Sequence, residues 1–286
     1  MKKQTIAVIG GSGLYELEDL REIKEHTVET PFGPPSDAII EGTIGDTKLL
    51  FLARHGRGHR LLPTEVNYRA NIFALKSLGA DQVVSISAVG SMREEIKPGD
   101  LVVVDQFIDR TKGRPSTFFG RGIVGHVMFA DPVCPELADR LYEVASSLEV
   151  KVHRGATLMV MEGPAFSTRA ESQLHRQLGV DLIGMTAMPE AKLAREAELC
   201  YATLALATDY DCWHEEEDDV SVDAVVKILK QNAQNARTVV SRLARTNRAK
   251  GSCTCGTALD FAIITDEKAI PSEIVGEMKP IFGRVL

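Results

Sequence analysis

The sequence contains no apolar run that approaches the roughly 20 residues a membrane-spanning helix needs. Its first residues carry a basic pair, but the apolar run that follows is short and broken by glycines, so a secretory signal peptide is not expected. Cysteine is scarce: five residues, an odd number, are scattered over 286 positions. That usage is typical of a reducing cytoplasm and not of a disulfide framework.

Basic residues are also in deficit, because 33 Lys and Arg face 40 Asp and Glu, for a formal net charge of −7. This excess of negative charge argues against nucleic acid as a partner, since phosphate contacts need clustered Lys and Arg. Internal repeats and linkers rich in Pro, Gly or Ser are absent as well. The 44% hydrophobic content is that of an ordinary globular protein, so a packed core is expected.

Strand-like runs alternate with helical patterns along the chain. Strands are predicted at residues 6–9, 37–43, 48–53, 83–87, 101–105, 155–160, 181–186 and 201–206, and helices at 66–78, 135–148 and 221–245, with two more starting near Ser167 and Pro189. Residues 109–131 form a long irregular region, which in a compact domain is usually functional or a subunit contact. The alternation predicts one α/β domain over residues 1–286, with 251–286 as a C-terminal extension.

Two carboxylates, Asp209 and Asp211, follow the apolar run 201–206. In open α/β sheets, ligands bind just past the carboxyl ends of the strands. Aspartate is also a common turn residue. The two carboxylates flank Tyr210, and the only tryptophan, Trp213, follows them, which favours a site over a plain turn.

The first strand runs into Gly10-Gly11-Ser12-Gly13-Leu14. Glycines there let backbone N–H groups approach an anion, and Ser12 adds a hydroxyl donor. A dinucleotide fingerprint is the alternative, but Glu16 occupies the position of its third glycine. A tight turn with no ligand would also explain the glycines.

Further anion donors follow two other strands. The run 48–53 ends in Arg54-His55-Gly56-Arg57-Gly58-His59-Arg60, the densest cationic patch of the sequence, and the run 83–87 ends at Ser87 and Ala88. Guanidinium groups match phosphate oxygens, and an imidazole can add a donor. A solvated basic loop is the competing interpretation of the first patch.

Two more strand ends offer Phe166 with Ser167, and Met185 with Thr186. An aromatic ring, a methionine and paired carboxylates suit a flat nitrogen heterocycle, whereas the cationic patch suits phosphate. The chemistry that joins the two is cleavage of a glycosidic bond by phosphate, in which a carboxylic acid protonates the leaving ring nitrogen.

These motifs resemble those of the trimeric purine nucleoside phosphorylases over roughly residues 5–245. The matching segments are Gly10-Gly11-Ser12-Gly13-Leu14, Thr30-Pro31-Phe32-Gly33, Ala53-Arg54-His55-Gly56-Arg57, Glu162-Gly163-Pro164, Gly184-Met185-Thr186 and Ala207-Thr208-Asp209-Tyr210-Asp211-Cys212-Trp213. Six ordered motifs are far more specific than a single glycine loop. The resemblance implies a single-domain three-layer sandwich, in which a central mixed β-sheet is flanked by helices.

The resemblance also implies a role for individual residues. Phosphate would be held by Gly11, Ser12, Arg54, His55, Ser87, Ala88 and Thr186. The nucleoside would contact Phe166, Ser167, Ile183, Met185, Asp209, Asp211, Val222, Val225 and, from a neighbouring subunit, His126. Asp209 would act as the acid at purine N7, with Asp211 beside it. A cytoplasmic homotrimer, or a dimer of trimers, is expected, with phosphate as co-substrate and neither metal nor organic cofactor.

Asp209 bears on which purine is bound. Adenine presents a 6-amino donor and an N7 acceptor, and an Asp carboxyl accepts from the first and, when protonated, donates to the second. A 6-oxopurine suits an Asn amide, which the relatives that act on those bases typically carry. The expected reaction is phosphorolysis of 5′-methylthioadenosine to adenine and 5-methylthioribose 1-phosphate. The alternatives are the same reaction on inosine, guanosine or methylthioinosine, and a non-catalytic nucleoside-binding protein.

Cys253-Thr254-Cys255 stands apart in the C-terminal extension. A zinc ribbon would need a second cysteine pair, which the sequence lacks. A disulfide across a single residue closes a small, strained ring, so reduced thiols are expected. Some thermophilic members of the family that the chain resembles pair such cysteines as a disulfide.

Overall fold

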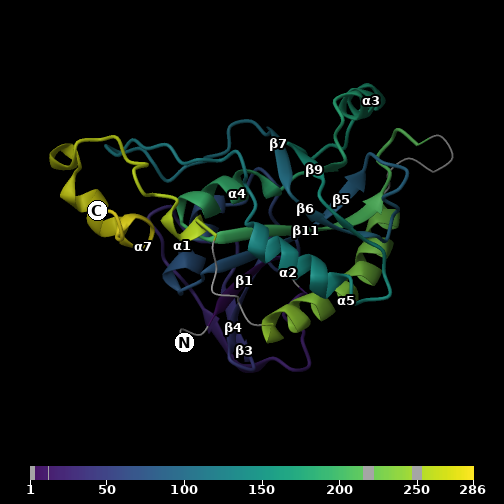
Figure 1. The fold of residues 1–286 in the computed structure, drawn as a ribbon, viewed down its shortest axis with the longest axis horizontal. Helices are drawn as coiled ribbons and strands as arrows, with labels where there is room; N and C mark the ends of the chain where they lie inside the picture. The colour runs from purple at the N-terminus through teal and green to yellow at the C-terminus, as the bar shows by residue number, and fades with distance from the viewer. Residues whose placement is uncertain (1–3, 12, 215–221, 247–252) are drawn as a thin grey trace.

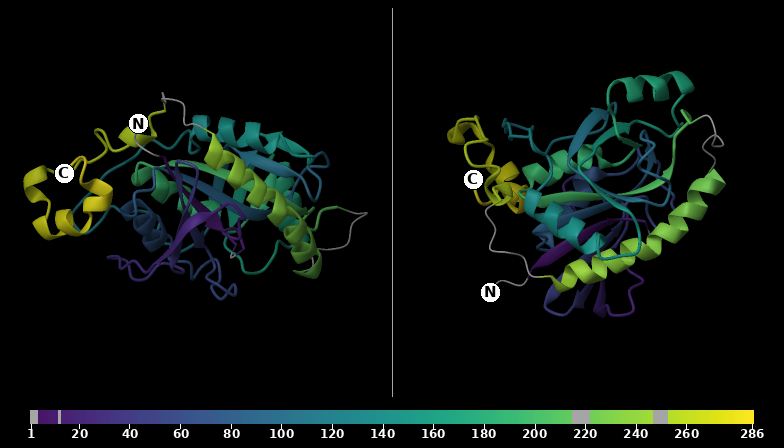
Figure 2. Two further views of the ribbon diagram at one scale, coloured as in Figure 1. Left: turned by 90° about the horizontal axis from the view of Figure 1, so that it is seen from below. Right: turned by 45° about the vertical axis from the view of Figure 1, so that its right-hand side comes forward.

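The computed structural model describes residues 4–11, 13–214, 222–246 and 253–286, and it leaves the side chains of residues 222–225, 227 and 229 outside the description. A large mixed β-sheet forms the middle of the molecule (Figure 1). Helices lie against both of its faces, so the architecture has three layers (Figure 2).

The centre of the sheet consists of parallel strands: β4 (Thr47–Ala53), β1 (Thr5–Gly10), β5 (Gln82–Ser91) and β11 (Cys200–Asp209). β3 (Ile39–Ile44) and β2 (Arg21–His26) extend it antiparallel beyond β4. The sheet continues from β5 and β11 in two branches. In the first, β5 pairs antiparallel with β10 (Leu182–Gly184), followed by β9 (Thr157–Met161) and β7 (Gln106–Arg110). In the second, β11 pairs with β6 (Leu101–Val104), which pairs with β8 (Val152–Arg154). The carboxyl ends of the four parallel strands therefore share one edge of the sheet.

The central strands are buried on both faces. Along β11, successive side chains alternate between two core clusters: Tyr201, Ala205 and Ala207 belong to one, and Cys200, Ala202, Leu204 and Leu206 belong to the other. Alternation of this kind follows from the two-residue period of a strand. Strands covered on both faces appear in a sequence as continuous apolar runs, which is why the runs at 6–9 and 201–206 predicted them correctly.

Two pairs of helices form the outer layers. α1 (Tyr68–Ser77) packs against α4 (Ala187–Glu196), and their buried residues belong to the first cluster. α2 (Pro135–Ala145) packs against α5 (Val222–Arg245) on the opposite face, in the second cluster. α3 (Arg169–Gln177) follows β9, and only one of its residues is buried. The expected α/β class, with a central mixed sheet flanked by helices, is confirmed.

Some strands have no clear signal in the sequence. β2 reads Arg-Glu-Ile-Lys-Glu-His and is almost wholly exposed at the sheet edge, so it lacks an apolar pattern. The predicted strand 155–160 corresponds to β9, which begins only at Thr157, because Gly155, with φ +79°, turns the chain between β9 and the short preceding strand β8. β5 is also longer than the predicted 83–87, because it continues to Ser91.

The C-terminal segment, residues 253–286, begins with two short 3-10 turns, Cys255–Thr257 and Glu267–Ala269. Two short α-helices follow them, α6 (Ser272–Glu277) and α7 (Lys279–Phe282). α7 packs against α1, and Ile281 and Phe282 join the first core cluster. The segment also pairs with the long loop, where His126 N–H donates to the Ala262 carbonyl at 2.9 Å. Among the described residues, no helix combines the length and apolarity needed to cross a membrane.

Candidate active site

The two aspartates lie where β11 ends. A bulge between Ala207 and Asp209 shifts the register of β11 against β5, and bulges re-aim side chains. The Thr208 hydroxyl donates to Asp209 Oδ2 at 2.7 Å, and the Asp211 N–H donates to Oδ1 at 2.8 Å. Burial raises the pKa of Asp209, and the charge of Asp211 acts in the same direction, while the two hydrogen bonds oppose the rise. A carboxyl group with a raised pKa is suited to donate a proton near neutral pH.

Asp211 is buried, and its backbone adopts the left-handed conformation with φ +54°. Among the described residues, its Oδ2 has no hydrogen-bond partner. Leaving a buried carboxylate oxygen unpaired costs free energy. A ligand that brings a donor, such as an exocyclic amino group, would satisfy this oxygen.

Gly90 in β5 makes room for this pair. A Cβ atom at Gly90 would lie 2.9 Å from Asp209 Oδ1 and 3.0 Å from Ile183 Cγ2. Ile183 is buried and pairs with Gly90 across β10 and β5. Only a residue without a side chain therefore lets the aspartate and the isoleucine meet here. Sequence alone marks Gly90 as small but gives no reason for it.

Phe166, Ser167 and Met185 reach the same region from other elements. The Cys212 thiol donates to the Ser167 carbonyl at 3.3 Å, which ties this segment to the one bearing the aspartates. Phe166 is 46% exposed, so its ring is accessible to a ligand. Met185 follows β10, and a Cβ at Gly163 would lie only 2.6 Å from its sulfur. Gly163 thus provides space for the methionine side chain.

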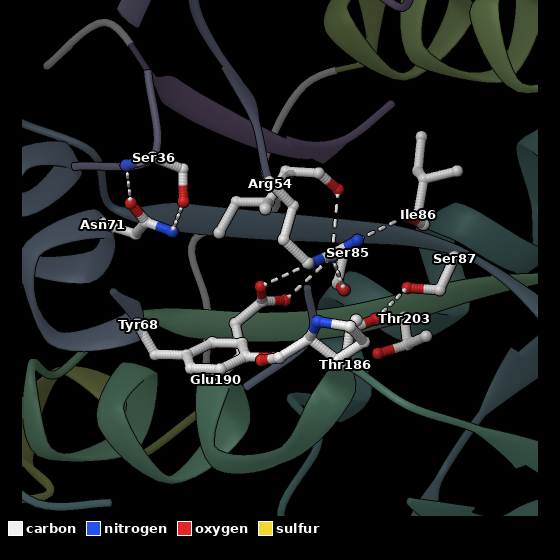
Figure 3. A network of polar contacts seen from close by, with 12 residues as sticks. Ser36, Arg54, Tyr68, Asn71, Ser85, Ile86, Ser87, Thr186, Glu190 and Thr203 are labelled. Carbon is white, nitrogen blue, oxygen red and sulfur yellow. Dashed lines mark hydrogen bonds and ion pairs between the residues drawn. The ribbon is translucent and has the colours of Figure 1, made fainter. Parts of the chain in front are cut away.

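Ser87 and Ala88 lie at a gap in the sheet. β1 pairs with β5 only as far as Ser85, and β10 begins to pair with β5 at Gly90. Between these two partner strands, the backbone groups of β5 face an opening in the sheet. Because β10 runs antiparallel to β5, the chain after Gly184 returns toward Ser87. There the hydroxyls of Ser87 and Thr186 lie 3.2 Å apart, as Figure 3 shows.

Thr186 immediately precedes α4, at the helix N-cap position. Its side chain caps no backbone N–H of the helix, so the hydroxyl is available to the opening beside Ser87. Met188 is extended, with φ −114° and ψ 134°, so the regular part of α4 starts only after it. The two hydroxyls at the opening are suited to donate hydrogen bonds to phosphate.

Arg54 lies under this opening, buried and bonded on several sides (Figure 3). Its Nε donates to Glu190 Oε2 at 2.9 Å, and its Nη2 donates to Ser85 Oγ at 2.8 Å. Nη1 donates to the Ile86 carbonyl at 3.0 Å. The Glu190 carboxylate neutralises the guanidinium charge, so Arg54 fixes the walls of the opening and offers an anion at most the remaining Nη1 hydrogen.

His55 is neutral at physiological pH. Burial lowers its pKa to about 4, and the charges of Arg54 and His59 add to the effect. Its Nδ1 lies 2.8 Å from the Leu61 carbonyl, which can only accept, so the proton of the neutral ring is on Nδ1 and Nε2 is an acceptor. This ring would bind a protonated phosphate oxygen.

The glycine turn after β1 borders the same edge of the sheet. A Cβ at Gly10 would lie 2.4 Å from Leu14 Cδ1, whereas a Cβ at Gly11 would meet nothing within 4 Å. Gly10 thus serves packing, and Gly11 faces open space. Ser12 lies outside the described residues, as do the side chains of Val222 and Val225.

His126 is exposed and lies with the C-terminal segment. In Figure 1 its loop extends beside that segment, on the side where β11 begins. Asp209 is at the other end of β11, and ten strand residues span about 30 Å. The chain therefore does not bring its own His126 to the remaining site residues.

Two residues that build the site have no distinct signal in the sequence. Glu190, in the first turn of α4, is the buried partner of Arg54 and also accepts from the Tyr201 hydroxyl at 3.0 Å. Arg114, in the long loop, donates from Nη1 to the Met185 carbonyl at 2.7 Å and from Nη2 to the Glu162 carbonyl at 2.7 Å. The partners of both residues are far away in the sequence, so no local sequence pattern predicts these contacts.

Tyr210 and Trp213 pack around the aspartates. The Tyr210 hydroxyl donates to the Glu94 carbonyl at 3.2 Å, and Trp213 Nε1 donates to the Ser91 carbonyl at 2.7 Å. The Arg176 guanidinium lies 3.6 Å from the centre of the indole ring. These contacts hold residues 209–213 against the end of β5 and against α3.

Known proteins resemble the chain closely. The model of the phosphorylase superfamily matches residues 5–245. The S-methyl-5′-thioadenosine phosphorylase of Geobacter sulfurreducens is 57% identical over 98% of this chain and 99% of its own, and that of Thermosynechococcus vestitus is 53% identical over the same shares.

Solved structures give the same result. A methylthioadenosine phosphorylase from an Antarctic soil metagenomic library is 49% identical and superposes with a TM-score of 0.92 over 98% of this chain and 99% of that one. A mutant adenosine/methylthioadenosine phosphorylase of Schistosoma mansoni, solved with methylthioadenosine, is 37% identical with a TM-score of 0.80 over 85% and 91%.

Proposed function

The chain belongs to the phosphorylase superfamily, and we propose that it cleaves S-methyl-5′-thioadenosine with phosphate to give adenine and 5-methylthioribose 1-phosphate. The observation that carries the proposal is the pair of aspartates at the end of β11. Asp209 has a raised pKa, and Asp211 has a buried oxygen that lacks a partner in the described structure. The hydroxyls of Ser87 and Thr186, 3.2 Å apart at the opening beside β5, would supply the phosphate site.

In the proposed reaction, a phosphate oxygen forms a bond to C1′ of the nucleoside as the C1′–N9 bond breaks. The electron pair of that bond passes to the purine, and Asp209 gives its proton to N7. The product is neutral adenine and a sugar phosphate that still carries the phosphate proton. Loss of this proton from the sugar phosphate restores the Asp209 carboxyl group.

Asp211 and the residues around it would hold the base. The unpaired Asp211 Oδ2 accepts a hydrogen bond from the 6-amino group, while Phe166 and Met185 contact the nucleoside. A carboxylate opposite position 6 repels the oxygen of a 6-oxopurine, because both groups are acceptors. The arrangement therefore favours adenine.

A substrate panel tests this proposal. We expect kcat/KM for methylthioadenosine to exceed the values for inosine and methylthioinosine, and we expect turnover to require phosphate. A preference for the 6-oxopurines would assign the chain to the alternative reaction. Turnover that is independent of phosphate would make the enzyme a hydrolase and contradict the proposal.

A homotrimer is part of the proposal. It is supported by the position of His126, far from its own Asp209, and by exposed apolar residues nearby. Met128 is 84% exposed, Phe261 is fully exposed and Ile264 is 65% exposed. Such a patch is typical of a protein interface. His126 of one subunit would then complete the 5′ pocket of its neighbour. Val222 and Val225, whose side chains lie outside the description, are further candidates to line it.

Analytical ultracentrifugation tests the assembly. The wild-type chain should sediment as a trimer, or as a dimer of trimers. Phe261→Asp should dissociate it and raise KM for methylthioadenosine, whereas Ile23→Asp, at the exposed β2 edge, should leave both unchanged. A wild-type monomer with full activity would contradict this part of the proposal.

The remaining expectations complete the proposal. Phosphate is a co-substrate, and the reaction uses no organic cofactor, because the proton donor and the anion site come from the chain itself. A cytoplasmic location accords with the reduced cysteines expected from the sequence. Fractionation of cells expressing the chain at native level tests the location.

A further inference from the structure

Four of the five cysteines meet at one place in the fold, away from the proposed active site. Cys134 is the residue before α2, Cys200 is the first residue of β11, and Cys253 and Cys255 begin the C-terminal segment. Their sulfur atoms all lie within 4.8 Å of one another. The Cys200 and Cys253 sulfurs are 3.6 Å apart. Only Cys212 lies elsewhere, near the aspartates.

The spacing of the sulfurs matches a tetrahedral metal site. A zinc ion with four thiolate ligands lies about 2.3 Å from each sulfur, which gives sulfur–sulfur edges of about 3.8 Å. The 3.6 Å contact is close to such an edge and much longer than the ~2.05 Å of a disulfide bond. Two disulfides would instead need each sulfur to approach a single partner and move away from the other two.

Rigid elements hold the ligands in place. Cys134 N–H donates to the Tyr201 carbonyl at 2.8 Å, which joins the start of α2 to the start of β11. Cys253 N–H donates to Glu136 Oε1 at 2.7 Å, which joins the C-terminal segment to the first turn of α2. Cys134, Cys200 and Cys255 are buried, and Cys253 is partly exposed. Four protein ligands in a closed setting are typical of structural zinc and leave no position for catalysis.

The local charge also suits this ligand set. Zinc with four thiolates carries a net charge of −2, and the N-terminus of α2, which starts at Pro135, favours negative charge. The Arg195 guanidinium, in the last turn of α4, interacts electrostatically with Cys255 and so adds a cation near the cluster.

We propose that Cys134, Cys200, Cys253 and Cys255 bind a zinc ion that fastens the C-terminal segment to the phosphorylase domain. Each thiol loses its proton to solvent as its sulfur binds the metal, and no oxidant or reductant is needed. The site lies at the amino end of β11, opposite Asp209, so it acts on stability. Because residues 262–264 pair with the loop that carries His126, the clip also holds that loop. The inference does not depend on the proposed activity.

Metal analysis of the full-length protein tests the site. Protein purified without chelators or added metal should contain about one zinc per chain by plasma mass spectrometry. Zinc K-edge absorption should show a four-sulfur shell at about 2.3 Å. Cys253→Ser, at the partly exposed ligand, should lose at least tenfold in zinc affinity, whereas Cys212→Ser, outside the cluster, should keep the wild-type metal content.

A second measurement needs no variant. Titration of the wild-type protein with a mercurial reagent should release zinc in step with loss of the four clustered thiols, and a chelating dye detects the release. Chelator treatment should lower the Tm, and added zinc should restore it. Metal-free protein whose intact mass is about 4 Da below that of the reduced chain would indicate two disulfides, and this result would overturn the proposal. Metal-free protein with four reactive thiols would overturn it equally.

Discussion

At the scale of single residues, the chemistry rests on what surrounds each group. Asp209 differs from an ordinary turn aspartate because it is buried beside a second carboxylate, and Gly90 is the residue that admits it. The sequence showed the pair of carboxylates and their place after a strand. It could not show Gly90 as their neighbour, because the contact joins residues more than one hundred positions apart.

The first prediction concerns Asp209. We expect Asp209→Asn to lower kcat/KM for methylthioadenosine by about 10²–10⁴-fold, because an amide cannot supply the proton to N7. Steady-state kinetics at saturating phosphate measure the effect. Asp139→Asn, on the exposed face of α2, is the control and should retain wild-type kinetics. A rate for Asp209→Asn within a few-fold of wild type would remove this residue from the role of acid.

The second prediction concerns His55 and pH. Its pKa is about 4 in the folded chain, against an ordinary 6.5, so the unfolded chain binds more protons between these values. Stability contributed by the neutral ring is therefore present above about pH 6.5 and is lost as the pH falls toward 4. Urea unfolding of wild type and His55→Gln from pH 7.5 to 4.5 measures this. The wild type should lose on the order of 1–2 kcal/mol more than the variant; parallel pH profiles would contradict it.

At the scale of elements, the phosphate site depends on how the sheet is interrupted. β1 stops pairing with β5 at Ser85, and β10 joins from Gly90, so Ser87 and Ala88 face an opening. Sequence reasoning placed Ser87 and Ala88 at a strand end, whereas both lie inside β5. What sets these two residues apart in the structure is a change of partner strand along β5, which depends on pairing and not on local pattern.

The third prediction concerns the link between β4 and α4. Glu190→Gln leaves the buried Arg54 charge uncompensated, and we expect the free energy of unfolding to fall by about 3–5 kcal/mol. The double variant Arg54→Met with Glu190→Leu removes both charges and should recover most of that loss while activity stays low. Chemical denaturation and kinetics measure the two effects. Equal stability of Glu190→Gln and wild type would show that the pair contributes little.

At the scale of the whole molecule, contacts between residues distant in sequence determine the features of the fold that local sequence patterns do not predict. The α/β class and most helices followed from apolar periodicity, because central strands and amphipathic helices carry that signal directly. The edge strand β2 did not, since its residues are charged and exposed. The cysteine tetrad was also hidden, because Cys134 and Cys200 supply the second pair from positions distant from Cys253 and Cys255.

The central claim is that phosphate, and not water, takes the sugar from adenine. The most direct measurement follows the wild-type reaction with methylthioadenosine and phosphate by ³¹P NMR, with adenine quantified in the same samples by chromatography. We predict a new phosphate-ester resonance that grows in equal molar amount with adenine, and no adenine when phosphate is omitted. Adenine release without the sugar phosphate, or no adenine at all, would contradict the account.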